Sequence, residues 1–398
     1  MLRYLTSGES HGQSLISIID GLPSNVELDF DEINKELKKR QCGYGRGGRM
    51  KIESDKINIL GGVRGKKTLG GPISIEVKNR DYQNWTEYMA PMNEVDFETR
   101  KVDNVRPGHA DLVGCLKYDF TDARNVLERS SARETASRVA VGAICKQVLK
   151  NFDIDFVSHV IQIGDAKDEN IYDFDYIKNN VDSSEVRCAN KEMEAKMIAQ
   201  IDKIKDEKDT IGGVVEVRVK NLIPGLGSFT QFDRKIDGVL AMHLMGTQAI
   251  KGVEFGIGFD VARLPGSKVM DEIIYNEKDG IKRATNRLGG IEGGMTTGEE
   301  IVIRCAMKPI PTLYKPLNSI NVNTLEKYQA TVERSDTCAV PACSVVCENV
   351  VAFVICQFFL ETIGGSSLED VKRNYNSYVQ RLGERGWKKY KIKYLIFL

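Results

Sequence analysis

The sequence has no net charge and little histidine. Its 398 residues include 56 Lys and Arg against 56 Asp and Glu, and only four His. Without net charge there is no overall field to attract nucleic acid or a membrane surface, so any anion site must come from local clustering. A composition with 41% hydrophobic and 28% charged residues is that of an ordinary globular protein. We therefore expect a soluble protein with neither nucleic acid nor membrane as its partner.

Several cofactor motifs are absent. No G-x-G-x-x-G lies between a predicted strand and a predicted helix, which argues against a Rossmann dinucleotide site. The P-loop pattern is missing too, so use of a nucleoside triphosphate has no support. Cys338, Cys343 and Cys347 lie close in sequence but do not form a C-x2-C pair. The sequence therefore predicts no metal site.

The nine cysteines are scattered, and the first residues, Met-Leu-Arg-Tyr, do not resemble a signal peptide. This pattern predicts reduced, mostly buried thiols in a cytoplasmic protein. The most apolar stretch, residues 345–360, contains Glu348, Asn349 and Gln357 and is short for a bilayer. It predicts a core helix that ends at Gly364 and Gly365.

Hydrophobic periodicity predicts strands and helices without a regular alternation. We expect strands at residues 2–6, 57–60, 73–77, 213–220 and 300–307. We expect helices at residues 31–40, with Asp31 as the N-cap, and from about Ser131, where Ser131 and Glu134 fit a capping box. Residues 151–208 are charged and weakly patterned, which indicates peripheral elements. The mixture favours an α+β fold over a doubly wound sheet.

Two of the four histidines lie in loops rich in glycine. His11 is in Gly-Glu-Ser-His-Gly at residues 8–12, directly after a predicted strand. Since imidazole exchanges protons near neutral pH, an accessible ring there is a candidate acid or base. An ordinary loop histidine bonded to backbone is the alternative.

His109 is in Arg-Pro-Gly-His-Ala-Asp at residues 106–111. Arg106 supplies a fixed cation, and Asp111 can orient the imidazole. An arginine beside an exposed imidazole suits an anionic leaving group, because both donate to phosphate oxygens. His159 and His243 lie in apolar settings and are predicted to be structural.

Cations gather in three segments. Residues 35–51 combine a glycine-rich loop with the basic residues Lys35, Lys38, Lys39, Arg40, Arg46, Arg49 and Lys51. This pattern favours a mobile loop that clamps anions, with a solvated face and a nucleic-acid site as alternatives. Arg129 to Glu134 open a predicted helix, whose free N–H groups, hydroxyls and Arg133 form a candidate phosphate site. Lys308, Thr312 and Arg334 add to the cations, and Asp336 is either a candidate base or a helix N-cap.

Seven segments in this order resemble the chorismate synthase family, over residues 1–383. They are the motifs at residues 8–12 and 106–111, Arg-Ser-Ser-Ala-Arg-Glu-Thr at 129–135, Gln-Ala-Ile-Lys-Gly-Val-Glu at 248–254, Gly-Gly-Ile-Glu-Gly-Gly at 289–294, Lys-Pro-Ile-Pro-Thr at 308–312 and Glu-Arg-Ser-Asp at 333–336. Each motif is weak alone, but seven in the family's order and spacing are specific.

The resemblance implies a phosphate-lyase in aromatic amino-acid biosynthesis. Its substrate is 5-enolpyruvylshikimate 3-phosphate, and an anti-1,4-elimination yields chorismate and phosphate. The reaction needs reduced FMN, with NADPH as a possible reductant. The implied fold is a β-α-β sandwich, with antiparallel sheets enclosing helices, in a homotetramer. A non-catalytic flavin- or phosphate-binding protein on the same scaffold is the alternative.

The resemblance also implies roles for individual residues. His11 protonates the reduced flavin, and His109 serves the departing phosphate. Asp336 helps the flavin N5 accept the proton that is lost from carbon. The implied FMN contacts are Arg129, Ser130, Ser131, Gln248, Ala249, Gly293, Lys308, Pro309, Ile310, Pro311, Thr312 and Arg334. The candidates for binding substrate or reductant are Arg40, Arg46, Arg49, Arg106 and Arg133.

Three features depart from the family pattern. Thr297 and Glu299 replace commoner residues after the glycine-rich turn, and His243 is unusual in its helix. The basic and apolar tail, residues 384–398, does not resemble the family. We expect residues 1–383 to form a single catalytic domain and the tail to be an atypical extension.

Overall fold

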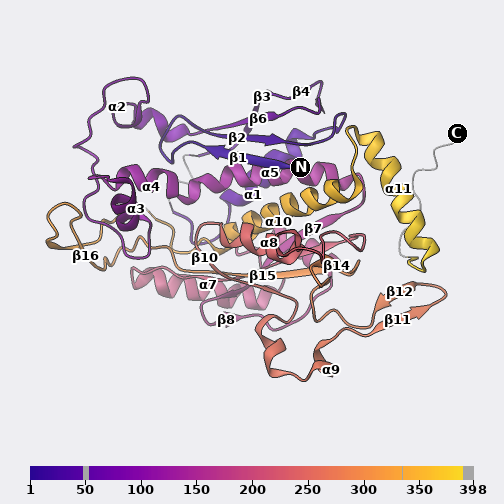
Figure 1. Ribbon diagram of the computed structural model, residues 1–398. Helices are drawn as coiled ribbons and strands as arrows, with labels where there is room; N and C mark the ends of the chain where they lie inside the picture. The colour runs from indigo at the N-terminus through magenta and orange to yellow at the C-terminus, as the bar shows by residue number, and fades with distance from the viewer. Residues whose placement is uncertain (48–52, 334, 389–398) are drawn as a thin grey trace.

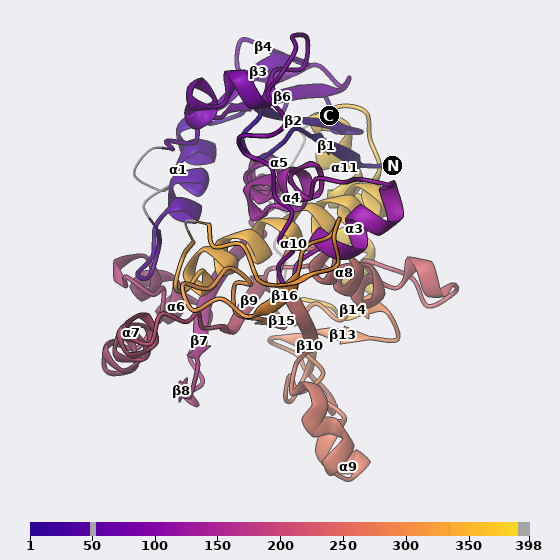
Figure 2. The ribbon, with the colours of Figure 1, turned by 90° about the vertical axis from the view of Figure 1, so that its left-hand side faces the viewer.

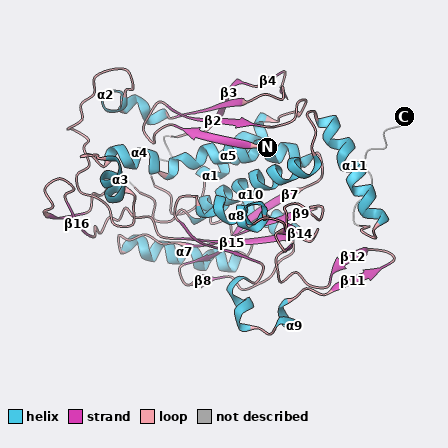
Figure 3. Ribbon diagram, in the orientation of Figure 1, coloured by secondary structure: helices cyan, strands magenta, loops and turns pink. Residues whose placement is uncertain are grey.

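A computed structural model describes residues 1–47, 53–333 and 335–388 of the chain (Figure 1). Arg49, Lys51 and Arg334, three of the predicted cations, lie outside the described residues. Two antiparallel sheets lie above and below a layer of helices, as Figures 1 and 3 show. The α+β sandwich predicted from the sequence is confirmed.

The upper sheet is built from the N-terminal strands in the order β1-β2-β6-β3. These strands are β1 (Arg3–Ser7), β2 (Ser14–Asp20), β3 (Ile57–Gly61) and β6 (Ile73–Lys78). In β6, Ile73, Ile75 and Val77 are buried, whereas the alternate residues are more exposed. This period of two packs one face of the sheet against the helices, as expected for a half-buried sheet.

The lower sheet has the order β10-β15-β9-β7-β8. Its strands are β7 (Asp155–Ile163), β8 (Ala166–Lys167), β9 (Gly213–Lys220), β10 (Ile250–Phe255) and β15 (Ile301–Met307). The expectation that residues 151–208 are all peripheral is wrong, because β7 lies inside this sheet with Val160 and Ile163 fully buried. Its charged flanking segments hide the apolar pattern of the strand itself.

Between the sheets lie α1 (Phe30–Gln41), α5 (Thr135–Lys150), α8 (Ile236–Met245) and α10 (Val340–Ile363) (Figure 2). One hydrophobic cluster runs through both sheets and these helices. Helices α5 and α10 approach closely at Gly142, where an added Cβ would lie 2.2 Å from the backbone oxygen of Asn349. A residue without a side chain is therefore required at that crossing.

Helix α10 is the core helix predicted at residues 345–360, and it begins earlier, at Val340. By length and composition it is apolar enough to cross a membrane, but 89% of its most apolar window is buried inside the protein. It ends at Gly364, whose φ of +69° is one that glycine adopts without strain.

Two predicted helix starts are wrong. Helix α1 is capped by Asp29, whose side chain accepts from the backbone N–H groups of Asp31 and Glu32, so Asp31 lies inside the first turn. Ser131 caps only a short 3-10 turn, η3 (Ala132–Glu134), and α5 begins at Thr135. Glu134 does not complete a capping box, because its carboxylate binds Thr6, Arg138 and Gln248 instead. These long-range partners are invisible to a local motif.

The remaining elements surround the sandwich. The helices are α2 (Thr86–Met89), α3 (Asp111–Tyr118), α4 (Arg124–Ser130), α6 (Phe174–Asn180), α7 (Lys191–Asp206), α9 (Gly266–Val269) and α11 (Leu368–Glu384). The 3-10 turns are η2 (Arg80–Asn84), η4 (Val181–Ser183), η5 (Phe232–Arg234) and η6 (Gly258–Arg263). The short strands are β4 (Val63–Arg64), β5 (Lys67–Thr68), β11 (Ile273–Asn276), β12 (Gly280–Arg283), β13 (Ile291–Glu292), β14 (Met295–Thr296), β16 (Asn318–Ile320) and β17 (Lys327–Gln329). In Figure 2, the segment with α9 projects away from the sandwich.

The first residues of the predicted tail are part of the fold. Trp387 is buried, and the backbone oxygen of Gly386 accepts from the N–H of Ile281 in β12 at 2.9 Å. Residues 389–398, the rest of the tail, lie outside the described residues.

Candidate active site

A cavity of about 380 Å³ lies at one end of the helical layer. Its wall comes from loop residues 10–11, 46–47, 106, 108–110, 333 and 335–336, from α4 and η3, from residues 247–249, 307–308 and 310–312, and from the first turns of α10. Segments more than 300 residues apart in the chain therefore meet around one space. Fifteen of the residues predicted for the site line it: His11, Arg40, Arg46, Arg106, His109, Ser130, Ser131, Arg133, Gln248, Ala249, Lys308, Ile310, Pro311, Thr312 and Asp336.

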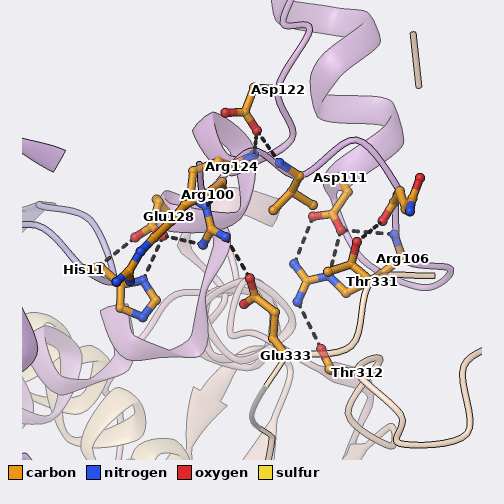
Figure 4. Close-up of polar contacts among 12 residues, drawn as sticks. His11, Arg100, Arg106, Asp111, Asp122, Arg124, Glu128, Thr312, Thr331 and Glu333 are labelled. Carbon is orange, nitrogen blue, oxygen red and sulfur yellow. Dashed lines mark hydrogen bonds and ion pairs between the residues drawn. The ribbon is translucent and has the colours of Figure 1, made fainter. Parts of the chain in front are cut away.

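His11 is held at the edge of the cavity by Glu128 of α4. The ring Nδ1 lies 2.8 Å from Glu128 Oε1, and the backbone N–H of His11 donates to Glu128 Oε2 at 2.7 Å (Figure 4). The indole of Trp85 stacks on the imidazole with 4.0 Å between the ring centroids. The side chain of His11 is only 12% exposed, so this loop histidine is tightly fixed.

His109 is held in a similar way by Asp111, the first residue of α3. Its Nδ1 lies 2.5 Å from Asp111 Oδ1, which confirms that Asp111 can orient the ring. Arg106 donates from Nε to Asp111 Oδ2 at 2.8 Å and from Nη1 to Thr312 Oγ1 at 3.0 Å (Figure 4). Although burial raises the pKa of the Asp111 carboxyl, the hydrogen bonds from His109 and Arg106 hold it well below its usual range. Asp111 is therefore an anion that keeps both donors in place.

In the described part of the chain, neither His11 nor His109 has a hydrogen-bond partner at Nε2. Both rings also line the cavity. A carboxylate accepts hydrogen bonds and cannot donate, so Nδ1 of each ring carries a proton. Nε2 is then the nitrogen of each ring that remains for a ligand, and it accepts or donates according to the ring's charge.

Asp336 lies in the loop before α10 and contacts the glycine-rich loop. Its Oδ1 accepts from the backbone N–H of Gly47 at 2.6 Å, and its Oδ2 lies 3.3 Å from Arg46 Nε. The alternative that Asp336 is the N-cap of the following helix is wrong, because Ala339 occupies that position and no side chain caps the helix.

Arg40 and Arg133 line the cavity but are already paired with carboxylates. Asp55 accepts from Arg133 Nη1 at 2.7 and 2.8 Å and from Arg40 Nη1 at 3.2 Å. Burial, more than the neighbouring cations, lowers the pKa of Arg40 to about 10, and Asp55 opposes that shift. Arg133, predicted to form a phosphate site with the helix start, thus lines the cavity with its charge already paired with Asp55. Their shared contact with Asp55 fixes both arginines in the wall of the cavity.

Residues 247–249, 307–308 and 310–312 of the wall include several of the predicted flavin contacts. Gln248 donates from Nε2 to Glu134 at 3.1 Å, whereas its Oε1 is buried without a partner among the described residues. Burial and the nearby Lys251 lower the pKa of Lys308, which also lines the cavity. A buried acceptor without a donor and a partly desolvated cation fit a ligand that carries N–H groups and a phosphate. The residues present thus fit a flavin mononucleotide.

Some predicted contacts lie outside the cavity wall. Arg129 donates to the backbone oxygens of Thr6 and Gly8 at 2.9 and 3.2 Å on an exposed surface. Gly293 is in the turn between β13 and β14, and Pro309 does not line the cavity although its neighbours do. Of the two departures nearby, Thr297 is buried, and Glu299 accepts from the backbone of Arg283 at 3.1 Å.

A second, wider groove of about 1380 Å³ adjoins the cavity at Arg46, Gly47 and Ser335. It is lined by the basic residues Lys35, Lys38, Lys39, Arg46, Arg187, Lys205 and Lys208 and by the acidic residues Asp182, Glu185 and Asp209. The excess of cations supports the predicted anion-attracting role of the described part of this loop.

The two remaining histidines are away from the cavity wall. His159 is buried in β7 with its Nε2 3.1 Å from Glu216 Oε1, and His243 in α8 packs against Phe353. Burial and the charge of Arg138 lower the pKa of His243. Both placements agree with the structural roles predicted for them.

Sequence reasoning missed four residues that hold the site together: Glu53, Asp55, Trp85 and Glu128. Glu128 directly precedes the motif at residues 129–135, and Trp85 is one of two tryptophans in the chain. Their positions were therefore visible, but the sequence gives no sign of the partners they meet. Among the described residues, no group of three or more His, Cys, Asp or Glu side chains could hold a metal ion.

Comparison with known proteins agrees with the geometry. The family model described as chorismate synthase matches residues 2–360. The chain is 54% identical over 379 residues to the chorismate synthase of Alkaliphilus metalliredigens (strain QYMF), covering 95% of this chain and 99% of that protein. It is 52% identical over 376 residues to the chorismate synthase of Staphylococcus aureus (strain Newman), covering 94% and 97% of the two chains. A crystal structure of a chorismate synthase superposes with a TM-score of 0.77 at 40% identity, covering 96% and 98% of the chains. The chain belongs to the chorismate synthase family.

Proposed function

We propose that this chain converts 5-enolpyruvylshikimate 3-phosphate to chorismate and phosphate. The observation that carries the proposal is the convergence of His11, His109 and Asp336 on one cavity, with each histidine held at Nδ1 by a carboxylate. An anti-1,4-elimination breaks one carbon–oxygen bond to phosphate and one carbon–hydrogen bond. It therefore needs a group for the leaving phosphate and a group for the lost proton.

His109 and Arg106 serve the departing phosphate in this proposal. Arg106 is fixed by Asp111 and Thr312, and His109 lies beside it with Nη2 of Arg106 3.2 Å from the ring. Two fixed donors stabilise the charge that develops on a leaving phosphate without having to reorganise. His109 donates a proton from Nε2 as the phosphate leaves.

His11 and Asp336 handle the other protons. With reduced FMN bound, His11 would hold a proton at Nε2 for the flavin, and Asp336 would assist the removal of the proton lost from carbon. Asp336 lies in the wall between the cavity and the groove, bonded to Gly47. Reduced FMN, when bound, supplies electron density transiently to the allylic system of the substrate.

The flavin is assigned to the part of the wall that contains Gln248 and Lys308. Gln248 offers a buried acceptor to a ring N–H group, and Lys308 offers a cation to the phosphate. The other residues assigned to FMN are Arg129, Ser130, Ser131, Ala249, Gly293, Pro309, Ile310, Pro311, Thr312 and Arg334. Arg46 and Arg49 in the glycine-rich loop are assigned to the substrate, since a guanidinium suits carboxylates and phosphate.

Anaerobic turnover tests this proposal. Phosphate and chorismate should be formed with enzymatically or chemically reduced FMN and not with oxidised FMN. Turnover without any flavin would contradict the proposal. Tight FMN binding with no phosphate release under reducing conditions would favour the non-catalytic alternative.

NADPH as the source of electrons is a separate proposal, supported by the cation-lined groove beside the cavity. NADPH carries several phosphates, which such a groove attracts. Oxidised FMN and NADPH together should then sustain anaerobic turnover, and failure of that pair with full activity on dithionite-reduced FMN would contradict it.

We also infer a homotetramer of cytoplasmic chains, each with residues 1–383 as one catalytic unit. The continuous hydrophobic core supports the single unit, and the nine free cysteines, eight of them buried, support a reducing compartment. Exposed apolar side chains support assembly: Leu5 and Ile18, paired across β1 and β2, and Phe259, Met270 and Ile273 on the projecting segment. Light scattering should give four chain masses per particle.

A further inference from the structure

We propose that Glu128 is a positioning residue that fixes the tautomer and the ring plane of His11, with Arg124 linking it to Glu333 across the cavity. The inference deepens the proposed function, since it rests on the role given there to His11. Nothing in the motifs of the sequence assigns a role to these three residues.

The carboxylate of Glu128 contacts both the backbone and the ring of His11. Its Oε2 accepts from the backbone N–H of His11 at 2.7 Å, and its Oε1 faces the ring Nδ1 at 2.8 Å. The backbone oxygen of Glu128 also accepts from the N–H of Ser10 at 2.9 Å. The loop and the imidazole are thus tied to the same residue of α4, and a turn of the ring would break its Nδ1 contact with Oε1.

The carboxylate determines which ring nitrogen carries a proton. Its side chain is 2% exposed, and although burial raises the pKa of Glu128, the hydrogen bonds and charge of His11 and the charge of Arg124 lower it below its ordinary value. An ionised carboxylate only accepts, so Nδ1 of His11 must be protonated. Nε2 is left toward the ligand, and it donates a proton when the ring is an imidazolium, the form that the carboxylate at Nδ1 stabilises.

Trp85 fixes the ring plane. Its indole stacks on His11 with an interplanar angle of 24°, and the guanidinium carbon of Arg100 lies 3.9 Å from the centroid of the indole on which it packs. Trp85 also donates from Nε1 to Asp81 at 3.4 Å. The imidazole is therefore restrained across its face by Trp85 and at its edge by Glu128.

Arg124 extends the contact to the other side of the cavity. Its Nη1 lies 3.3 Å from Glu128 Oε1 and its Nη2 3.0 Å from Glu333 Oε1, and Glu333 lines the cavity (Figure 4). Its Nε donates to the backbone oxygen of Arg100 at 2.8 Å, which prevents the guanidinium from swinging away. The series of side-chain contacts from His11 through Glu128 and Arg124 to Glu333 joins α4 to the segment that carries Asp336.

Glu128→Gln is the sharpest test, because an amide has a single acceptor oxygen. The backbone N–H of His11 always donates, whereas Nδ1 can give up its proton and Arg124 keeps Glu333 as a partner. The amide oxygen is therefore expected at the backbone N–H, which leaves the NH2 group facing Nδ1. Nδ1 must then become an acceptor, and the proton moves to Nε2. We expect kcat to fall on the order of 10²-fold or more, with KM for the substrate nearly unchanged.

The tautomer is read directly by 15N NMR of the histidine rings in flavin-free protein. The chain has only four histidines, so each can be assigned by its own substitution. The wild type should show a protonated Nδ1 at His11, E128Q a protonated Nε2, and Glu128→Ala a mixture. These signals do not depend on turnover.

Glu216→Gln is a matched control, because Glu216 forms a second glutamate–histidine pair among the described residues, with His159 in the lower sheet. We expect E216Q to lower the melting temperature while the folded enzyme keeps its kcat and the His11 signals of the wild type. A general loss of stability is thereby separated from a loss of positioning.

Wild-type kcat in E128Q, or a protonated Nδ1 at His11 in that variant, would overturn the inference. The near-isosteric Gln keeps it testable even if E128A does not fold. Absence of phosphate release from the wild type would instead defeat the proposed function, and the His11 tautomer would still report on Glu128.

Discussion

His109 and Arg106 both donate to the carboxylate of Asp111. A substitution at Asp111 therefore removes a partner from both side chains. Asp111 is fully buried and accepts from the backbone, Nε and Nη2 of Arg106 as well as from His109. If the carboxylate is removed, the guanidinium of Arg106 is left buried without its counter-ion. The free-energy cost of that unpaired charge exceeds the net stabilisation that the ion pair itself provides.

We expect Asp111→Asn to reduce both stability and rate. One amide oxygen cannot serve four donors, so the variant should lose about 3–5 kcal/mol of unfolding free energy. Urea unfolding and phosphate release measure the two effects. Asp279→Asn in an exposed turn is the control and should change neither. Unchanged stability in the Asp111 variant would mean that Arg106 finds another partner.

Replacing His11 or His109 by Ala should cost on the order of 10²–10⁴ in rate, the range for a lost general acid. Circular dichroism and a thermal melt should show an intact fold, because both rings lie at the cavity rather than in the core. His243→Gln, in the helical layer, is the control and should retain the wild-type rate. A fully active His109→Ala enzyme would remove that residue from the leaving-group role.

The residues that line the cavity were easier to predict than the carboxylates that fix those residues by hydrogen bonds. His11, His109 and Asp336 lie in motifs whose composition indicates chemistry. Asp55 and Glu128 lie in no such motif, and their partners are 78 and 117 residues away in the chain. Pairing at that distance is decided by the fold, so a single sequence could not assign it.

At the scale of elements, periodicity located five strands and the core helix but missed β2, β7 and β10 and misplaced helix starts. The alternation in residues 73–77 and the apolar run of 345–360 predict buried side chains, and these side chains are buried in β6 and α10. Caps depend on one hydrogen bond each. Asp29 and Asp31 are chemically equal candidates, and only backbone geometry decides that Asp29 is the cap.

The crossing of α5 and α10 gives a prediction at this scale. In Gly142→Ala the new Cβ would lie 2.2 Å from the backbone oxygen of Asn349, so the two helices must separate. Overpacking of this kind costs about 1–3 kcal/mol, more than the gain of about 1 kcal/mol from helix propensity. We expect a net loss of unfolding free energy, measured in urea.

Gly383→Ala in α11 is the matched control. A Cβ at Gly383 meets no atom within 4 Å, so only the propensity gain remains. This variant should be more stable by about 0.5–1 kcal/mol. Stabilisation of both variants would show that α5 and α10 adjust freely, contrary to the close packing at their crossing.

At the scale of the whole molecule, this neutral protein buries a subset of its carboxylates against cations and hydrogen-bond donors. Carboxyl groups in the lower sheet and in several helices and helical turns have their pKa lowered by hydrogen bonds or cations that outweigh burial. They are Glu36, Asp111, Glu128, Glu134 and Glu216. Each is ionised in the folded state at pH values where the unfolded chain would already bind a proton.

This distribution predicts how stability depends on pH. A carboxyl group with a lowered folded pKa stabilises the protein above its unfolded pKa of about 4, and this contribution is lost as pH falls through the folded value. His243 acts in the same direction at higher pH, because its lowered pKa makes the unfolded chain bind the proton first, below about pH 6.5. Glu300, whose pKa burial raises, opposes the trend.

Melting temperatures should therefore decline slightly from pH 7 to 5 and steeply below about pH 4.5. Glu216→Gln should start from a lower melting temperature and show a shallower acid decline, because it removes one of the groups that must be protonated. His243→Gln should flatten the shallow part between pH 7 and 5 and leave the steep part unchanged. A melting temperature that rises between pH 5 and 3 would mean that burial, rather than pairing, dominates these carboxyl groups.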